Sequence, residues 1–424
     1  MLWKRKCGKN TKCDESEEVN YSLEQIEEKY IKLLLNRCLN FNLSKSLFIR
    51  YSTINQDFIL KLVNQAKSMG INDIYLKAED PYVTHNILKS ISIEEIETHP
   101  YFNSHMWDVY VEKNASFLSF ESDIPNLMDD ISPDKLVKAD YIDRATRPLF
   151  KKKQGNFEIP WCIAALPNKE WANKIFPNSD NSYEKLFKLI GKMCMLDTED
   201  PIKSWNDHSI NEINRVNKLN KLEIQKLHYQ NNLGTNFYVE LLKNGLWCST
   251  VNVGEDMFPN MPSYEIFTSP NMYKTEGIVY SSKPLIHNGA EIEEFFLEFE
   301  DGKVVNYGAK KGKEALRNII ENDEYSCYLG EVALVNYDSP ISNTGIVFGE
   351  TLFDENASCH FALGGGFLGC VKNNKNLNKE ELIEMGLNQS TSHVDFMIGT
   401  KDLNITAYTK KGKVVIFKDG NFNI

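Results

Sequence analysis

The spacing of apolar residues changes part-way along the chain, and this change constrains the fold more than any other feature. Up to about residue 230, segments with helical periodicity alternate with short apolar runs such as 47–51 and 73–76. Helices that connect consecutive strands allow those strands to pair in parallel, so this order predicts a largely parallel sheet covered by helices. From about residue 232, strand-like runs alternate with turn signals such as Asp301-Gly302, which indicates a β-rich arrangement.

We therefore expect an α/β protein with two domains, because 424 residues exceed what one hydrophobic core usually supports. The first, over residues 21–230, is predicted to be an N-terminal α/β domain with a largely parallel sheet. The second, over residues 231–424, is predicted to be a C-terminal β-rich α+β domain that carries the functional site. Residues 1–20 contain basic side chains but no apolar segment, so we interpret them as a disordered lead-in rather than a secretion signal.

Periodicity and flanking residues place the elements of the first domain. Gly70 is a usual stop signal after an amphipathic segment. A strand is expected over 159–166, and no glycine-rich phosphate loop follows any of the predicted strands, so the sequence gives no support for a nucleotide site. Helices are expected over residues 22–39, 56–69, 182–195 and 209–228.

Composition limits the classes of partner. Hydrophobic residues make up 42% and charged residues 25%, as in soluble globular proteins. The net charge of −11 argues against nucleic-acid or anionic-membrane partners, and no apolar run approaches the roughly 20 residues of a membrane-spanning helix. Nine cysteines with scattered spacings form no disulfide framework, so a reducing cytoplasm is the expected compartment. The basic run Lys151-Lys152-Lys153 is interpreted as solvated surface.

Five residues of the second half offer ligand types that divalent metal ions prefer. They lie in short motifs with apolar flanks, and they are Glu265, Glu331, His360, His393 and Asp395. Imidazoles and carboxylates suit one or two Zn²⁺-like cations. His393 and Asp395 stand two residues apart in an apolar segment, and such positions of a strand point to the same face. Each residue alone is more often structural, but together they favour a metal-dependent hydrolase.

Four segments around these residues carry a resemblance. They are 260–270 (NMPSYEIFTSP), 329–335 (LGEVALV), 351–362 (TLFDENASCHFA) and 388–399 (NQSTSHVDFMIG). They resemble the M29 family of metallo-aminopeptidases, the group of aminopeptidases T and S, with weaker likeness upstream in 159–166 and 200–205. The resemblance implies a cytoplasmic two-domain exopeptidase, usually a homodimer, that releases N-terminal residues from peptides.

The resemblance also implies two divalent cations in the C-terminal domain, Zn²⁺ or Co²⁺, with Mn²⁺ or Mg²⁺ as alternatives. The metal ligands of the family correspond by motif to Glu265, Glu331, His360, His393 and Asp395. Either Glu331 or Asp395 could bridge the two ions. The implied mechanism is hydrolysis by a water whose pKa the ions lower while they polarise the scissile carbonyl, with Glu265 and Glu331 among the catalytic residues.

Two departures from the family pattern bear on activity. Tyr264 stands where the family commonly has a carboxylate, and Phe367 stands where it commonly has a tyrosine. Loss of one donor to a tetrahedral oxyanion costs about 2.7–4 kcal/mol, and we hypothesise that Tyr264 supplies the missing hydroxyl from another direction. The chain is therefore an active metallo-aminopeptidase, a catalytically impaired metal-binding homologue that acts as a binding or scaffold protein, or a hydrolase of a non-peptide amide.

Overall fold

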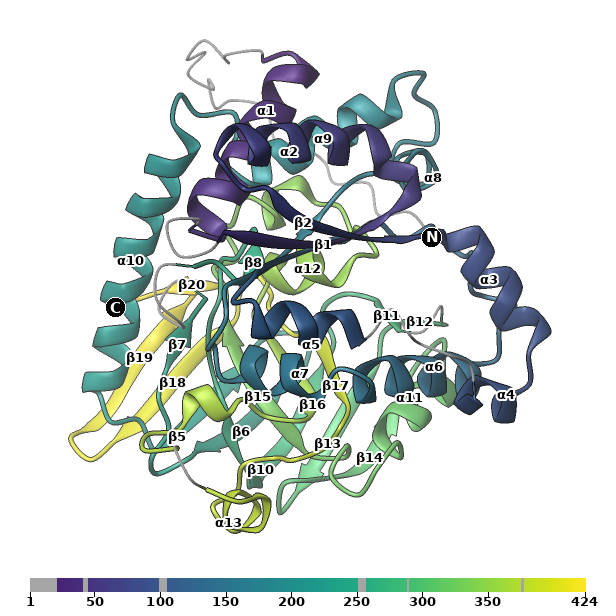
Figure 1. Cartoon of the computed structure of the whole chain (residues 1–424). Helices are drawn as coiled ribbons and strands as arrows, with labels where there is room; N and C mark the ends of the chain where they lie inside the picture. Colours follow the sequence, from purple (N-terminus) through teal and green to yellow (C-terminus); the bar gives the residue numbers. More distant parts are fainter. Residues whose placement is uncertain (1–20, 41–44, 99–104, 251–256, 288–289, 375–376) are drawn as a thin grey trace.

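A layer of parallel strands lies above a layer of antiparallel strands in the computed structural model (Figure 1). The structure describes residues 21–40, 45–98, 105–250, 257–287, 290–374 and 377–424. The predicted lead-in over residues 1–20 lies outside the described residues. Within the described part of the chain, no helix combines the length and apolarity needed to cross a membrane.

The upper layer is a sheet of five parallel strands in the order β2-β1-β3-β4-β8. Its strands are β1 (Ser46–Ser52), β2 (Asp73–Glu79), β3 (Ser116–Glu121), β4 (Trp161–Ala165) and β8 (Asn260–Met261). The predicted α/β class with a parallel sheet is thus confirmed. Because β8 follows residue 230, the second half of the chain contributes a strand to this sheet. The division into 21–230 and 231–424 stays a prediction.

Helices cover both faces of the parallel sheet, as the alternation of side chains in β1 requires. Leu47 and Ile49 face one hydrophobic core, whereas Phe48 faces another. The helices over the first core are α1 (Leu23–Leu33), α2 (Gln56–Ser68), α8 (Lys169–Ile175) and α9 (Ser182–Met193), and those over the second are α5 (His105–Glu112) and α7 (Pro148–Gly155) (Figure 1). The other helices are α3 (Pro81–Ser90), α4 (Ile93–Thr98), α6 (Pro133–Ala145), α11 (Lys313–Ile320), α12 (Thr351–Asp354) and α13 (Lys379–Glu384).

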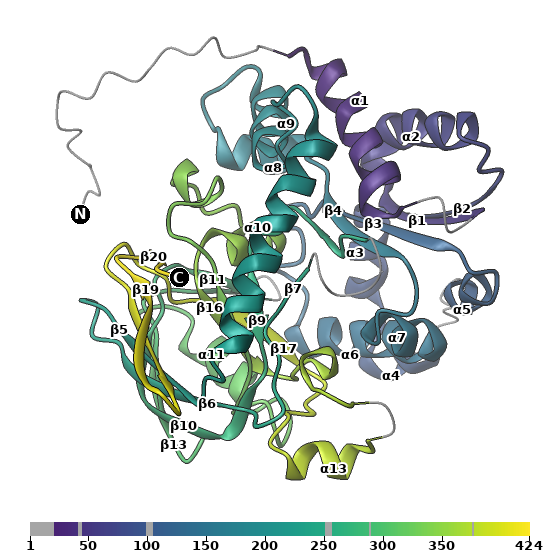
Figure 2. The same ribbon diagram turned by 90° about the vertical axis from the view of Figure 1, so that its left-hand side faces the viewer.

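The helix predicted over 209–228 is wrong at both ends. Helix α10 covers Pro201–Lys221 and runs alongside both layers (Figure 2). It begins early because the Asp200 side chain accepts a hydrogen bond from the Lys203 amide, 3.0 Å away, and Pro201 occupies the first turn. The residues after it form strand β5 (Lys226–Gln230), in which buried positions alternate with more accessible ones.

The lower layer is antiparallel. One sheet has the order β14-β13-β10-β6-β5-β18-β19-β20, and another has the order β17-β16-β15-β9-β7. The ring of Phe361 in the second lies 5.0 Å from Tyr229 and 5.3 Å from Phe237 in the first, so the sheets share a core. The strands are β6 (Asn236–Leu241), β7 (Cys248–Ser249), β9 (Ile266–Thr268), β10 (Pro270–Tyr280), β13 (Phe296–Glu300), β14 (Lys303–Gly308), β15 (Leu329–Leu334), β16 (His360–Gly364), β17 (His393–Met397), β18 (Asn404–Thr409), β19 (Gly412–Lys418) and β20 (Asn421–Phe422), with β11 (Leu285–His287) and β12 (Ala290–Ile292) as a separate pair.

The segment between β15 and β16 joins the two layers. Phe348, Phe353 and Ala357 belong to the hydrophobic core beneath α1, α2 and α9. The indole N–H of Trp171 in α8 donates to the Phe348 carbonyl over 2.8 Å. The chain then returns to the antiparallel sheet at His360, so β16 begins beside the parallel layer.

Candidate metal centre

Neighbouring strands of the β17-β16-β15-β9-β7 sheet bring the five predicted ligands to one place. Glu265 directly precedes β9, Glu331 lies in β15, and His360 begins β16. Ala362 of β16 is paired with both Glu331 and Asp395. Paired residues share a face of the sheet, as do residues two apart in one strand. His360, Glu331, His393 and Asp395 therefore project from the same face.

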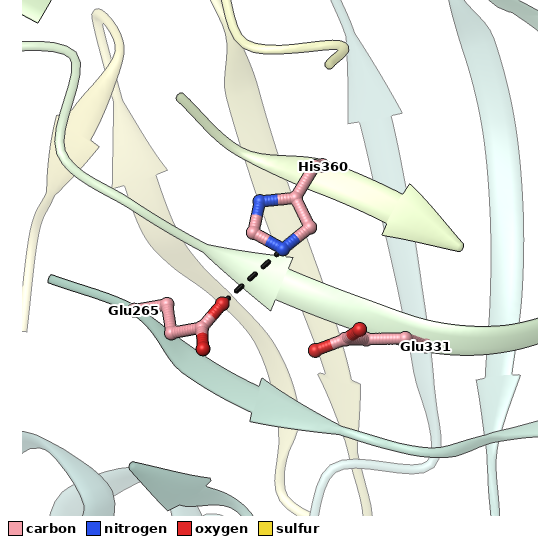
Figure 3. Close-up of side chains that lie close together, drawn as sticks. All are labelled: Glu265, Glu331 and His360. Carbon is pink, nitrogen blue, oxygen red and sulfur yellow. Dashed lines mark ion pairs between the residues drawn. The ribbon is translucent and has the colours of Figure 1, made fainter. Parts of the chain in front are cut away.

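The five side chains form two overlapping triads. Glu265, Glu331 and His360 make one triad, and Glu331, His393 and Asp395 make the other; in each, one ligand atom per residue lies within 4.8 Å of the others. Figure 3 shows the first triad converging on one point, with the Nε2 of His360 3.2 Å from the Oε2 of Glu265. Glu331 is common to both triads. The first triad is buried, whereas His393 is partly accessible, so the second triad is the more open side.

Backbone carbonyls orient both imidazoles. The Nδ1 of His360 lies 3.1 Å from the Ser358 carbonyl, and the Nδ1 of His393 lies 2.7 Å from the Gly365 carbonyl. A carbonyl only accepts, so each Nδ1 carries a proton and each Nε2 faces the carboxylates, where it would bind a cation after losing its own proton. This outer hydrogen bond is the usual support of a metal-binding histidine.

Burial and mutual repulsion shift the titration of the cluster. Burial, together with the charges of Asp395 and Glu265, raises the pKa of Glu331 to about 7. Burial alone would lower the pKa of His360, but its hydrogen bond and attraction to Glu265 outweigh this effect and raise it to about 10. Burial would raise the pKa of Asp395, and the charge of His393 instead lowers it. In the metal-free site, protons on Glu331 and His360 therefore offset the negative charge of the clustered carboxylates.

These residues fit a metal ion. The Oδ1 of Asp395 is buried and makes no hydrogen bond of acceptable geometry to any residue that the structure describes, although the Nε2 of His393 is 3.3 Å away. A buried carboxylate oxygen without a donor is costly unless a cation binds it. Three carboxylates and two imidazoles whose Nε2 atoms face them suit Zn²⁺-like ions in donor chemistry.

Glu355, a sixth member of the site, is not predicted from any sequence pattern. It lies in the 3₁₀ turn Glu355–Ala357, five residues before His360. Burial raises the pKa of its carboxyl group well above the usual value, and the charges of Glu265 and Asp395 raise it further. The adjacent Asp354 differs, because its carboxylate accepts hydrogen bonds from the Phe348 and Gly349 amides, 2.9 and 2.8 Å away.

The two departures from the family pattern lie in different surroundings. The ring of Phe367 is 5.1 Å from the imidazole of His393, so an apolar ring borders the second triad. The hydroxyl of Tyr264 instead donates to the Met193 carbonyl over 2.7 Å, and its ring packs on Trp205 and His208. The structure therefore does not bring the Tyr264 hydroxyl to the five ligands. The hypothesis that it replaces a lost phenol finds no support in this geometry.

Comparisons with known proteins identify the family of the chain. The family model described as thermophilic metalloprotease (M29) matches residues 23–422, and the chain belongs to this family of metallo-aminopeptidases. Its sequence is 33% identical to aminopeptidase AmpS of Bacillus subtilis, over 95% of this chain and 99% of that protein. It is 34% identical to aminopeptidase PepS of Streptococcus thermophilus, over 94% and 98%. The structure of wild-type AmpT from Thermus thermophilus superposes with a TM-score of 0.86 at 26% identity, over 95% of this chain and 99% of that chain.

Proposed function

We propose that the protein is a metal-dependent aminopeptidase that releases N-terminal residues from peptides. The observation that carries the proposal is the pair of triads that share Glu331, because it provides two adjacent binding positions for cations on one face of a sheet. Membership of the M29 family supports the same activity. A cytoplasmic homodimer is proposed with it; the seven cysteines of the described part are all free thiols, which suits a reducing compartment.

Glu265, Glu331 and His360 would hold one divalent cation, and Glu331, His393 and Asp395 would hold the other. Zn²⁺ or Co²⁺ is proposed, with Mn²⁺ or Mg²⁺ as alternatives. When bound, the ions would polarise the scissile carbonyl and lower the pKa of the attacking water. Glu331 is the proposed bridge, because it is the member common to both triads.

Glu355 is the proposed proton carrier. It lies close enough to Glu265 and Asp395 for their charges to raise its pKa, but it belongs to neither triad. Bound cations would offset the charges that raise its pKa, and the Glu355 carboxylate would then take a proton from the attacking water and deliver it to the leaving nitrogen. General acid–base catalysis of this kind contributes about 10²–10⁴-fold to a rate.

A second candidate is a metal-binding homologue with impaired turnover, acting as a binding or scaffold protein. The observation that favours it is the apolar ring of Phe367 beside His393, where the family resemblance implies a phenol. A hydrolase of a non-peptide amide is the third candidate. In the second and third candidates alike, the five ligands would hold two cations in the same two triads.

The test uses the purified protein loaded with Zn²⁺, Co²⁺ or Mn²⁺. An aminopeptidase releases p-nitroaniline from aminoacyl anilides and spares the N-acetylated forms, which lack the free amine. Glu355→Gln should lower kcat about 10²–10⁴-fold with two metals per chain retained, whereas the exposed control Glu380→Gln should match the wild type. Two bound metals without turnover of any anilide or peptide would instead support the second or third candidate.

A further inference from the structure

A cavity of about 380 Å³ extends along one face of the parallel sheet and reaches the carboxyl ends of β2 and β3 at Glu79 and Glu121. None of the five predicted ligands lines it. Arg50 of β1, Glu79 of β2 and Glu121 of β3 form its floor, and α6 and α7 contribute further walls. In the order β2-β1-β3-β4, the strand after β1 pairs on one side of it, and β3 and β4 follow on the other side. The order of the strands therefore reverses between β1 and β3. The carboxyl edge at such a switch point is where open parallel sheets bind ligands.

The charged residues of the cavity wall are paired, with one exception. Arg50 contacts Glu79 at 2.9 Å and Glu121 at 3.0 Å. Two further pairs come from α6 and the residues after it, Arg144 with Asp140 at 2.8 Å and Arg147 with Asp143 at 2.7 Å.

Lys151 of α7 is the exception. No carboxylate of a described residue lies within 4.0 Å of its Nζ, which instead donates to the Gln154 side-chain oxygen over 3.4 Å. The sequence-based interpretation of the basic run as solvated surface is correct for Lys152, which is exposed, and wrong for Lys151, which is partly buried. Burial and the nearby charges of Arg144 and Arg147 lower the pKa of Lys151 to about 8. The four cations and four carboxylates of the cavity wall balance in total charge, and Lys151 is the one cation among them that no carboxylate of the described residues contacts.

Two buried N–H groups of the wall also lack a partner. The Nε of Arg147 and the Nε1 of Trp161 make no hydrogen bond to any residue in the described ranges. Buried donors are rarely left unsatisfied, because their desolvation is then uncompensated. One ammonium group without an ion-pair partner and two free N–H donors match a carboxylate, which carries one negative charge and two acceptor oxygens.

The cavity lies close to the metal centre. Helix α6 lies next to β17, which carries His393 and Asp395, in both views (Figures 1 and 2). Trp161 of the cavity wall stacks on Phe157 at 6.3 Å, and Phe157 packs against the same small cluster as Phe367, the neighbour of His393.

The imidazole of His287 provides a second link. Burial lowers its pKa, and the charges of both Asp140 on the cavity wall and Asp395 in the second triad oppose this shift. Asp140 of the cavity wall and Asp395 of the second triad are thus both close enough to His287 for their charges to affect its pKa.

We propose that this cavity binds the C-terminal carboxylate of a short peptide whose N-terminal residue lies at the metal centre. The inference rests on the proposed aminopeptidase function and names its substrate class, short peptides with a free C-terminus. Lys151, the N–H of Arg147 and the indole N–H of Trp161 are the specificity-determining groups.

The test compares tripeptides and tetrapeptides as free acids and as C-terminal amides. The wild type should prefer the better-fitting free acid about tenfold in kcat/KM, through KM, because a charge-assisted hydrogen bond is lost in the amide. Lys151→Met should abolish the preference, Lys151→Arg should keep most of it, and the exposed control Lys152→Met should keep all of it. Equal use of acid and amide by the wild type at both lengths, or a preference unchanged in Lys151→Met, overturns the proposal.

Two further arms separate the explanations. An aminoacyl anilide has no carboxylate, so Lys151→Met should turn it over as the wild type does, which reports on the metal centre alone. A peptide amide with a C-terminal aspartate side chain shows whether any carboxylate suffices; full restoration of the preference would overturn the assignment to the C-terminus.

If no substrate is turned over, the proposed function fails and calorimetry decides on the cavity. The same free acids and amides are then titrated into the metal-free protein and into Lys151→Met. Acid-selective binding that Lys151→Met abolishes supports the carboxylate site, and equal binding of acid and amide overturns it. Thermal unfolding confirms that each variant is folded, and Lys151→Gln replaces Lys151→Met if that variant is not.

Discussion

Tyr264 and Glu265 are adjacent in the sequence, yet they contact different parts of the molecule. Glu265 reaches the Nε2 of His360, while the Tyr264 hydroxyl donates to the Met193 carbonyl inside the core of the parallel layer. Successive residues of an extended chain point to opposite sides. Replacement of the family carboxylate at position 264 therefore changes the packing behind the site, and its ring does not extend the metal centre.

Tyr264→Phe should lower the free energy of unfolding by about 1–2 kcal/mol, because it leaves a buried carbonyl without its donor. The metal content and kcat should stay at wild-type values. Urea unfolding measures the stability, elemental analysis the metal content and an anilide assay kcat. The exposed Tyr141→Phe is the matched control. A loss of turnover without a loss of stability would revive the hypothesis that the Tyr264 hydroxyl acts in catalysis.

Phe367→Tyr adds a phenol beside His393. If an absent oxyanion donor limits the rate, kcat for an aminoacyl anilide should rise by about 10²-fold, as expected for one such donor. Phe157→Tyr is the control, since Phe157 packs on the same cluster but its ring stacks on Trp161 and not on His393. An unchanged kcat in Phe367→Tyr would show that the apolar ring does not limit turnover.

At the scale of elements, the close approach of β15 and the turn after β16 fixes the spacing of the ligands. A Cβ on Gly330 would lie 2.1 Å from the Gly364 carbonyl oxygen and 2.4 Å from that of Gly365, and both are backbone atoms. Gly365 also accepts from the His393 imidazole. Glycine at position 330 is thus required by packing around Glu331.

Gly330→Ala should destabilise the protein by about 1–3 kcal/mol through overpacking and should lower the affinity for metal. Thermal unfolding and metal titration measure the two effects. Gly155→Ala is the control, because its Cβ would meet no atom within 4 Å and its φ is not positive. If Gly330→Ala kept the stability and metal affinity of the wild type, β15 and the turn after β16 would be able to move apart at little cost.

At the scale of the whole molecule, the ligands come from strands of the antiparallel layer, while Glu355 reaches them from a segment packed into the parallel layer. Unfolding of either layer would disperse the site. Metal binding should therefore stabilise the whole chain, because ligands that bind only the native state raise its unfolding temperature.

Metal affinity should rise with pH. In the metal-free protein, the pKa of Glu331 is about 7 and that of His360 is about 10. Below these pH values each group carries a proton, which a cation must displace. Affinity should fall by up to about tenfold per pH unit below 7 for each proton released. Calorimetry at pH 6, 7 and 8 in buffers of different ionisation enthalpy gives affinity and proton count, and a pH-independent affinity without proton release would contradict this.

The shared core also bears on the predicted division at residue 230. A fragment of residues 21–230 lacks β8 and the side chains of Phe348 and Phe353, which fill the core of the parallel layer. It should unfold without a cooperative transition, while the full chain should show one. Circular dichroism during heating distinguishes them, and a cooperative fragment would support the division.

Local periodicity predicted most of the elements, because alternation in 47–51 and helical spacing in 56–69 reflect which face of each element is buried. It failed over 209–228, where polar residues mask the start of α10 and the strand β5 follows directly. The five ligands could be predicted from the sequence, because each lies in a continuous segment that resembles a motif of the family. Glu355 could not be distinguished from Asp354, because the carboxylates are alike in sequence and differ in their surroundings.

By itself, the sequence determined the class of fold and the ligand types, because both depend on residue patterns over short stretches. The tertiary structure decided three further points: that Glu331 belongs to both triads, that Tyr264 points into a core, and that Lys151 lies unpaired in a cavity. Each depends on residues far apart in the chain. Burial, pairing and charge are properties of neighbours in space, and folding alone establishes those neighbours.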